Sequence, residues 1–235
     1  MFTRRFLSTM KRDIAILWDL DGTLMDTETI GVDITKKILE QLRPGASVME
    51  ESFVMSFLSI PAPRRFEIIS KHQQVEDLIT PEDFSNRYLD MMIPASATAP
   101  LLPGSMRILK YFHDNKIKQA VATSSRRVLL EIKQQNNPDL FQYFDAVISG
   151  HDKEIQHPKP SPDIFLHTAS VLQVDPKNCI VFEDSINGIK AGLAAGMKVV
   201  AIPSKPIPKE NLKGCCQVLN TLNDFDGTMF DLPPM

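Results

Sequence analysis

The sequence contains few cysteines, no long apolar run and no strong excess of either charge. Its 235 residues include 3 cysteines, and the spacing of these cysteines matches no zinc or haem motif. The 26 basic and 29 acidic side chains nearly cancel, which argues against nucleic-acid or membrane binding by bulk charge. No apolar run reaches the roughly 18–20 residues of a transmembrane helix. The composition favours a globular protein of a reducing compartment, with neither nucleic acid nor a membrane as its partner.

The first twelve residues, MFTRRFLSTMKR, are basic and contain no acidic side chain. Phe2, Phe6 and Leu7 would share one face of a helix. This composition is typical of an organelle-import presequence, and a basic tail is the other interpretation of the segment. A secretory signal would need a longer apolar stretch than this segment has. We expect a cytoplasmic protein, with import into mitochondria as the alternative.

Short apolar runs alternate with helical patterns in residues 13–27 and 97–235. This alternation predicts βαβ units and an α/β fold, in which helices cover both faces of a parallel sheet. We expect the two segments to form one catalytic core. The predicted strands cover residues 14–18, 117–122, 146–149, 179–182, 198–202 and, last and shortest, 217–219. The predicted helices cover residues 105–115, 163–172 and 184–195, with one more after residue 125.

Residues 28–96 have a different pattern, which contains no convincing strand. Apolar side chains recur every four residues in Thr29–Leu42, as on one face of a helix. Thr80, Pro81 and the two acids that follow form a typical helix start. We therefore predict a helical domain inserted into the core. Its other helical stretches are predicted at residues 53–58, 66–69 and 84–93.

Polar side chains follow three of the predicted strands. Asp19 and Asp21 follow the first strand, Thr123 follows the second, and Glu183 and Asp184 follow a later one. Ligands bind at the carboxyl ends of the strands in open α/β sheets. Three separate segments therefore bring acids and a hydroxyl group to one edge of the sheet.

These acids suggest a metal site. Asp19 and Asp21 lie two residues apart, so both side chains fall on the same side of an extended segment. Two like charges at this spacing need a cation, or one of them must hold a proton. With Glu183 and Asp184, the acids form an oxygen-rich set that suits Mg²⁺. Magnesium beside a carboxylate favours phosphoryl transfer, in which the carboxylate can form an aspartyl phosphate.

Donors for phosphate oxygens are also present. Thr123, Ser124 and Ser125 offer hydroxyl groups and the amides at the start of the next predicted helix, which is a natural anion site. Lys159 lies in the segment His-Pro-Lys-Pro-Ser-Pro, whose three prolines stiffen the loop. Its ammonium could stabilise charge on a nucleophile and on the transferred group. A small phosphorylated metabolite is therefore the expected partner.

Taken together, these motifs resemble the haloacid dehalogenase superfamily in their order and spacing. The resemblance implies a Rossmann-like parallel sheet with an inserted four-helix cap, because further motifs are similar to those of the subfamily with a helical cap. The four motifs are Asp19–Leu24, Thr123, Lys159-Pro160 and Glu183–Ser185, and the further ones are residues 26–28 and 188–196.

The resemblance also implies roles for single residues. Asp19 would be the nucleophile and Asp21 the general acid and base. Thr123 and Ser124 would bind the phosphoryl group, and Lys159 would stabilise it. The magnesium ligands would be Asp19, the backbone carbonyl of Asp21, Asp184 and, in or next to the coordination sphere, Glu183.

A narrower resemblance concerns the substrate. The core motifs and residues 219–235 are similar to a branch that hydrolyses pseudouridine 5′-phosphate, glycerol phosphate and flavin mononucleotide. The cap departs from that branch, because Ser56 stands where relatives usually have glycine, and Pro61 and Pro63 interrupt the next stretch. The cap contacts the substrate in this family, so these departures concern the substrate rather than the reaction.

β-Phosphoglucomutase has similar motifs and is the alternative. Its cap histidine corresponds to a place near Gly31, which has no side chain to donate a proton. We therefore expect a monomeric, magnesium-dependent phosphatase. Its expected substrate is pseudouridine 5′-phosphate or a similar sugar, nucleotide or polyol phosphate, with glycerol phosphate or a phosphomutase reaction as alternatives.

Overall fold

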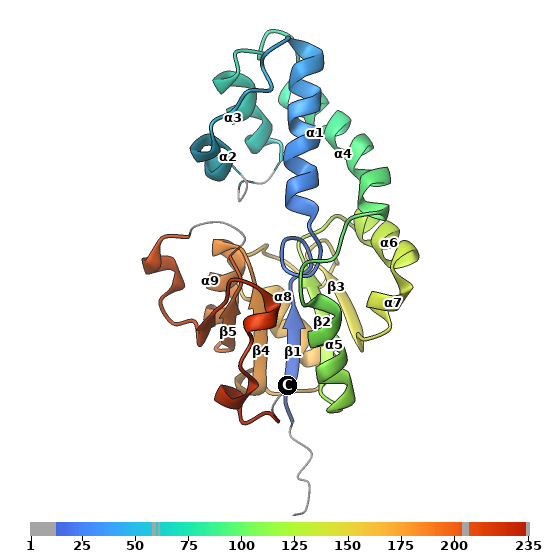
Figure 1. Cartoon of the computed structure of the whole chain (residues 1–235), viewed down its shortest axis with the longest axis vertical. Helices are drawn as coiled ribbons and strands as arrows, with labels where there is room; N and C mark the ends of the chain where they lie inside the picture. The colour runs from blue at the N-terminus through green and yellow to red at the C-terminus, as the bar shows by residue number, and fades with distance from the viewer. Residues whose placement is uncertain (1–12, 58–59, 61, 204–206, 234–235) are drawn as a thin grey trace, which may run out of the picture.

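The computed structural model describes residues 13–57, 60, 62–203 and 207–233, and the expectations for residues 1–12 and for Pro61 lie outside this part. Figure 1 shows a sheet with helices on both sides and a separate group of helices beyond one end of the strands. The sheet has six parallel strands in the order β3-β2-β1-β4-β5-β6. They are β1 (Ala15–Trp18), β2 (Lys118–Thr123), β3 (Ala146–Ser149), β4 (Cys179–Glu183), β5 (Lys198–Ala201) and β6 (Gln217–Val218).

The central strand β1 is apolar on both faces, as a parallel strand covered by helices must be. Ile16 and Trp18 point to one face, while Ala15 and Leu17 point to the other, and all four side chains are fully buried. The strand order places β2 on one side of β1 and β4 on the other, so the direction of the connections changes at β1. This is the place where open α/β sheets bind their ligands. The predicted α/β, Rossmann-like fold is confirmed.

Two apolar layers hold helices against the sheet (Figure 1). The layer with Trp18 contains α5 (Ser105–Asp114), α6 (Arg127–Asn136) and α7 (Pro138–Phe141), of which α7 was not predicted. The opposite layer contains α8 (Asp163–Leu172) and α9 (Ile186–Ala194). The end of the chain also packs into the layer with Trp18, through Phe225, Phe230 and Leu232.

Four helices lie between β1 and α5 and enclose an apolar core of their own. Asp26 caps the first helix through the amide of Thr29, and Thr80 caps the last through the amide of Asp83. The last helix was predicted to end at residue 93, but it continues past Pro94. The helices are α1 (Thr27–Leu42), α2 (Glu51–Phe57), α3 (Arg64–His72) and α4 (Pro81–Ala97). We call this group the cap and the rest of the described chain the core.

Within the described residues, no helix is both long enough and apolar enough to cross a membrane. The cap instead contacts the core, because α4 packs against α6 and Leu129 of α6 joins the apolar cluster of the cap. The C-terminal ends of the strands point toward the cap (Figure 1). The side chains that follow these strands therefore face the region between core and cap.

Candidate active site

A cavity of about 580 Å³ lies between the cap and the C-terminal edge of the sheet. This volume falls within the roughly 300–1,000 Å³ of typical small-molecule sites. Six of the seven predicted site residues line it, and the seventh, Glu183, is fully buried beside it. The six are Asp19, Asp21, Thr123, Ser124, Lys159 and Asp184.

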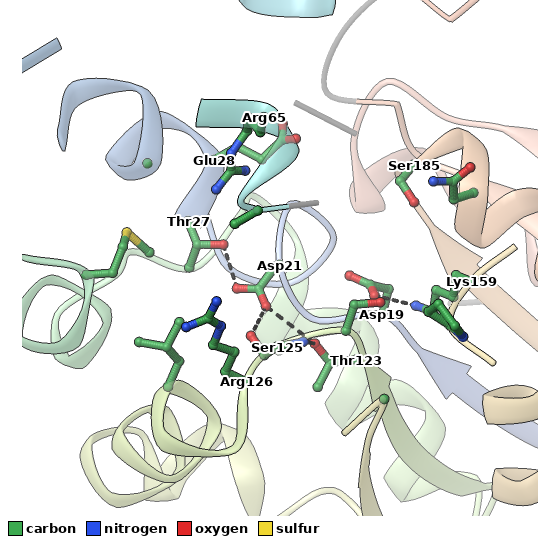
Figure 2. Close-up of a pocket in the computed structure, with 18 of the residues that line it drawn as sticks. Asp19, Asp21, Thr27, Glu28, Arg65, Thr123, Ser125, Arg126, Lys159 and Ser185 are labelled. Carbon is green, nitrogen blue, oxygen red and sulfur yellow. Dashed lines mark hydrogen bonds and ion pairs between the residues drawn. The ribbon is translucent and has the colours of Figure 1, made fainter. Parts of the chain in front are cut away.

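Lys159 joins two of the predicted acids. Its Nζ lies 2.6 Å from Oδ1 of Asp19 and 2.7 Å from Oε1 of Glu183. A third hydrogen bond, to the carbonyl of Ala122, is 2.9 Å long. The other oxygen of Glu183 accepts hydrogen bonds from the amide and hydroxyl of Ser185. Glu183 therefore holds the ammonium of Lys159 against Asp19, and Figure 2 shows Asp19 and Lys159 pointing toward each other.

The burial of these groups changes how readily they ionise. Burial raises the pKa of Asp19 to about 7, although the ammonium of Lys159 opposes this shift. Burial would lower the pKa of Lys159, but the charges of Asp19 and Glu183 outweigh it and raise that pKa above its usual range. Lys159 is therefore a permanent cation at the site.

Asp184 adds a further buried carboxyl group. It accepts a hydrogen bond of 3.1 Å from the hydroxyl of Thr23. Burial raises the pKa of Asp184 well above its usual value, and the charges of Glu183 and Asp19 raise it further. In the described part of the chain, the only ammonium in contact with Asp19, Glu183 and Asp184 is that of Lys159. When ionised, the three carboxyl groups would carry more negative charge than Lys159 offsets, and a divalent cation would offset the rest.

The donor chemistry fits magnesium, which prefers hard oxygen ligands and keeps several waters. Among residues 13–57, 60, 62–203 and 207–233, no three carboxylate, imidazole or thiol side chains are arranged as a ready-made metal site. The expected set needs only the side chains of Asp19 and Asp184 and the carbonyl of Asp21. The absence of a three-side-chain site is therefore compatible with the expected magnesium ligands.

Asp21 is surrounded by donors (Figure 2). One carboxylate oxygen accepts from Thr27 at 2.6 Å and from Lys133, and the other accepts from Thr123 at 3.3 Å and from Ser125. Burial alone would raise the pKa of Asp21, but the charge of Lys133 and these hydrogen bonds outweigh it and lower the pKa below its usual value. Asp21 is therefore ionised in the absence of ligand.

The segment after β2 provides the side of the site that is expected to hold phosphate. The hydroxyl of Thr123 accepts a hydrogen bond of 3.0 Å from the amide of Ser125. Ser124 is exposed and lines the cavity. Helix α6 begins two residues after Ser125, at Arg127, so the positive end of its dipole lies next to these hydroxyl groups. Hydroxyl groups and a helix N-terminus are suited to an anion.

The cap contributes a polar wall that contains one of two adjacent arginines. Arg64 is exposed and pairs with Glu67. Arg65 lines the cavity, and its guanidinium lies 4.8 Å from the ring centre of Phe66 and 5.0 Å from that of Tyr88. Its Nε is buried and has no hydrogen-bond partner among the described residues. Figure 2 shows Arg65 above Asp21 on the cap side of the pocket.

Gly31 and Tyr88 also line the cavity, and they lie next to each other. A Cβ added at Gly31 would lie 2.5 Å from the hydroxyl oxygen of Tyr88, so only glycine leaves room for that hydroxyl. Burial raises the pKa of Tyr88, which keeps its hydroxyl protonated.

Several side chains of the site were not predicted from the sequence. Lys133 is the clearest of them, since it lies in the last turn of α6 and contacts Asp21 across 112 positions of sequence. Ser125 was predicted as a donor to phosphate oxygens and Thr27 belongs to the motif at residues 26–28, but their hydrogen bonds to Asp21 were not predicted. Arg65 is also among the side chains that were not predicted: it is adjacent to Arg64 in the sequence, but Arg64 pairs with Glu67 whereas Arg65 lies beside Tyr88 at the cavity.

Comparison with known proteins agrees with this geometry. A sequence profile described as haloacid dehalogenase-like hydrolase matches residues 16–202. A Drosophila melanogaster protein named "Probable pseudouridine-5′-phosphatase" is 34% identical over 92% of this chain and 93% of its own length. An Arabidopsis thaliana protein named "(DL)-glycerol-3-phosphatase 1, mitochondrial" is 30% identical over 93% of this chain and 73% of its own.

A crystal structure from Thermotoga maritima, provisionally assigned as a β-phosphoglucomutase, has the same fold. The two structures superimpose with a TM-score of 0.72 at 25% sequence identity. The match covers 89% of this chain and 97% of the other. Cap and core are therefore both included in the similarity.

Proposed function

Because this chain belongs to the haloacid dehalogenase-like hydrolase family, we propose that its pocket hydrolyses a phosphate monoester through an aspartyl phosphate on Asp19. The named phosphatases among its relatives make it a phosphoric monoester hydrolase that acts on sugar or polyol phosphates. The observation that carries the proposal is the contact of 2.6 Å between Asp19 and Lys159 at the switch point of the sheet.

In the first half of the reaction, a carboxylate oxygen of Asp19 attacks phosphorus and the bond from phosphorus to the ester oxygen breaks. Asp21 gives a proton to that oxygen, and the alcohol leaves. In the second half, Asp21 takes a proton from water, whose oxygen attacks the phosphorus. The bond from phosphorus to Asp19 then breaks, which releases phosphate and restores the carboxylate.

The low pKa of Asp21 suits its role as a base, and its role as an acid needs a proton that arrives with the substrate. Phosphate monoesters ionise for the second time near pH 6, so the monoanion carries such a proton. Thr123 and Ser124 would donate hydrogen bonds to phosphoryl oxygens. Lys159, held by Glu183, would offset the negative charge that builds up between Asp19 and phosphorus.

We propose that the cofactor is Mg²⁺, held by Asp19, Asp184 and the backbone carbonyl of Asp21. When bound, the ion would neutralise charge on the phosphoryl oxygens and on the buried carboxyl groups. Both oxygens of Glu183 are already hydrogen-bonded to protein donors. For this reason we place Glu183 beside the coordination sphere rather than in it.

Pseudouridine 5′-phosphate is the substrate that we propose first. The relative with 34% identity is named for this compound, and the cap side of the pocket suits a planar base with carbonyl oxygens. There Phe57 and Met92 supply apolar surface, and Arg65 supplies donors. Glycerol phosphate is the second candidate, on the name of the Arabidopsis relative.

A phosphomutase must remove a proton from a sugar hydroxyl, whose oxygen then attacks the phosphoryl group on the enzyme in place of water. In this chain Gly31 has no side chain at the place where the expected mutase residue would lie, and the hydroxyl of Tyr88 occupies the space beside it. The protonated hydroxyl of Tyr88 is a weak base at neutral pH. This arrangement favours hydrolysis of the phosphate ester over transfer of the phosphate to another hydroxyl of the sugar.

The experiment is phosphate release from a panel that contains pseudouridine 5′-phosphate, uridine 5′-phosphate, glycerol phosphates, flavin mononucleotide and hexose phosphates, each with Mg²⁺. We expect one compound to exceed the others by about 100-fold in kcat/KM, which corresponds to about 2.7 kcal/mol of transition-state binding. Asp19→Asn is the control and should abolish release. Undiminished release by that variant would contradict the proposal, as would an isomerised sugar phosphate formed without release of phosphate.

A further inference from the structure

Lys133 has an unusual place for a lysine. It lies on the buried side of α6 with Leu130, and its side chain is 1% exposed. Burying an ammonium without a partner costs several kcal/mol, whereas an apolar side chain at the same place would cost nothing of this kind. The packing of α6 therefore gives no reason for a lysine, and the reason must lie in what the ammonium contacts.

The ammonium of Lys133 contacts the active site. It forms an ion pair with Asp21 and donates a hydrogen bond of 2.8 Å to the hydroxyl of Ser125. Ser125 in turn donates to the other carboxylate oxygen of Asp21. The three side chains thus form a closed triangle. Within the described residues, Lys133 has no other recorded hydrogen-bond acceptor for its ammonium.

This triangle fixes the orientation of the Asp21 carboxyl group. Lys133 and Thr27 bind one oxygen, and Ser125 and Thr123 bind the other, so rotation about the last side-chain bond would break several hydrogen bonds. Lys133 is the one charged donor among the four. Charge-assisted hydrogen bonds are roughly twice as strong as neutral ones, so Lys133 contributes most to this orientation.

We propose that Lys133 is a positioning residue that holds Asp21 where it can exchange a proton with the ester oxygen of the substrate. The inference rests on the proposed function, in which Asp21 is the general acid and base. Lys133 does not itself line the cavity, so it acts through Asp21 and Ser125 rather than on the substrate.

The test compares two esters in one variant, Lys133→Met. A glycerol phosphate releases an alkoxide and needs a proton on the leaving oxygen, whereas p-nitrophenyl phosphate releases a stable phenolate and does not. The value of kcat/KM reports only the steps up to formation of the aspartyl phosphate. We expect it to fall by about 100-fold for the alkyl ester and by less than about fivefold for the aryl ester.

Because both esters are measured on one preparation, any loss of folded protein cancels in the ratio. Lys110→Met is the matched control, since it removes an ammonium that pairs with Asp114 on the exposed side of α5. It should leave both values unchanged. Equal losses of the two esters in Lys133→Met would overturn the inference and show a structural role, and so would no loss of either.

Failure of the proposed function gives a different result. In that case Asp19→Asn would keep its activity on both esters, whatever Lys133→Met does. The aryl ester also allows a second reading of the variant. If Asp21 is misplaced as a base, the aspartyl phosphate should accumulate, and p-nitrophenol should appear in a burst of about one equivalent before steady turnover.

Discussion

Gly188, in the first turn of α9, lies so close to the carboxyl group of Glu183 that a Cβ at position 188 would overlap it. Glu183 is fully buried and holds Lys159 at 2.7 Å. Because Gly188 has no side chain, Glu183 has room to hold the ammonium of Lys159, which comes from another segment of the chain.

Gly188→Ala should therefore lower activity, although Gly188 itself does not line the cavity. The added methyl group must displace the Glu183 carboxyl group, which would move Lys159 away from Asp19. We expect kcat to fall by about 10-fold or more, with a loss of stability of about 1–3 kcal/mol from overpacking. Steady-state kinetics and thermal unfolding check this. Gly150→Ala is the control, because a Cβ there would meet no atom closer than 3.5 Å, and equal behaviour of the two variants would refute the argument.

The fold and the centre of the site could be predicted because their signals are local. A buried parallel strand such as Ala15–Trp18 is a short apolar run, and Asp19 directly follows it. The carboxyl ends of parallel strands share one edge, so residues far apart in sequence could be brought together by topology alone. Glu183 and Lys159 are placed in this way.

The missed residues depend on contacts that no local pattern encodes. Lys133 occupies a buried position of a short helix, where sequence alone shows only a lysine among apolar and polar residues. Arg64 and Arg65 are neighbours on α3, about 100° apart around the helix, so one faces outward while the other faces the cavity. In a helix of nine residues that begins after a proline, the sequence does not determine which of the two arginines faces the cavity.

Magnesium binding should depend on pH. Burial raises the pKa of Asp19 to about 7 and that of Asp184 above its usual value, so the metal-free protein holds protons that the unfolded chain loses near pH 4. Its stability should therefore fall as pH rises from about 4 to 7. A bound ion must displace these protons, so the affinity for Mg²⁺ should weaken as pH falls below about 7.

Thermal unfolding with and without Mg²⁺ at several pH values measures this linkage. The increase in Tm on adding Mg²⁺ should be greatest above about pH 7 and should shrink toward pH 5. Asp114→Asn is the control, because this exposed aspartate lies on α5 and pairs with Lys110. An increase in Tm that does not vary with pH would show that the buried acids are not the magnesium ligands. In that case Asp184→Asn should show the same increase in Tm on adding Mg²⁺ as the unaltered protein.

The end of the chain should be required for stability. Phe225 is buried, and its ring lies 5.1 Å from that of Phe182 in β4 and 5.7 Å from that of Phe112 in α5. We expect Phe225→Ala to lower the free energy of unfolding by about 3–5 kcal/mol, as for other buried aromatic side chains. Met229→Ala, at a position 60% exposed, should change it by less than about 0.5 kcal/mol. Denaturant unfolding measures both, and a small effect of Phe225→Ala would show that the tail is not part of the cooperative core.

The cap arginine should determine substrate choice. Arg65 lines the cavity with a buried, unpartnered Nε, whereas Arg64 is 66% exposed and pairs with Glu67. Arg65→Met should lower kcat/KM for the preferred substrate by about 10- to 100-fold, because a truncated donor leaves polar atoms of the substrate unpaired.

Inorganic phosphate, which is too small to span the pocket, should inhibit Arg65→Met and the unaltered enzyme with similar inhibition constants. Arg64→Met has the same change of charge and should match the unaltered enzyme in both assays. If the two variants behave alike, the cap recognises its substrate without Arg65, and Glu28, Ser85 and Tyr88, which also line the pocket, become the next polar side chains to test.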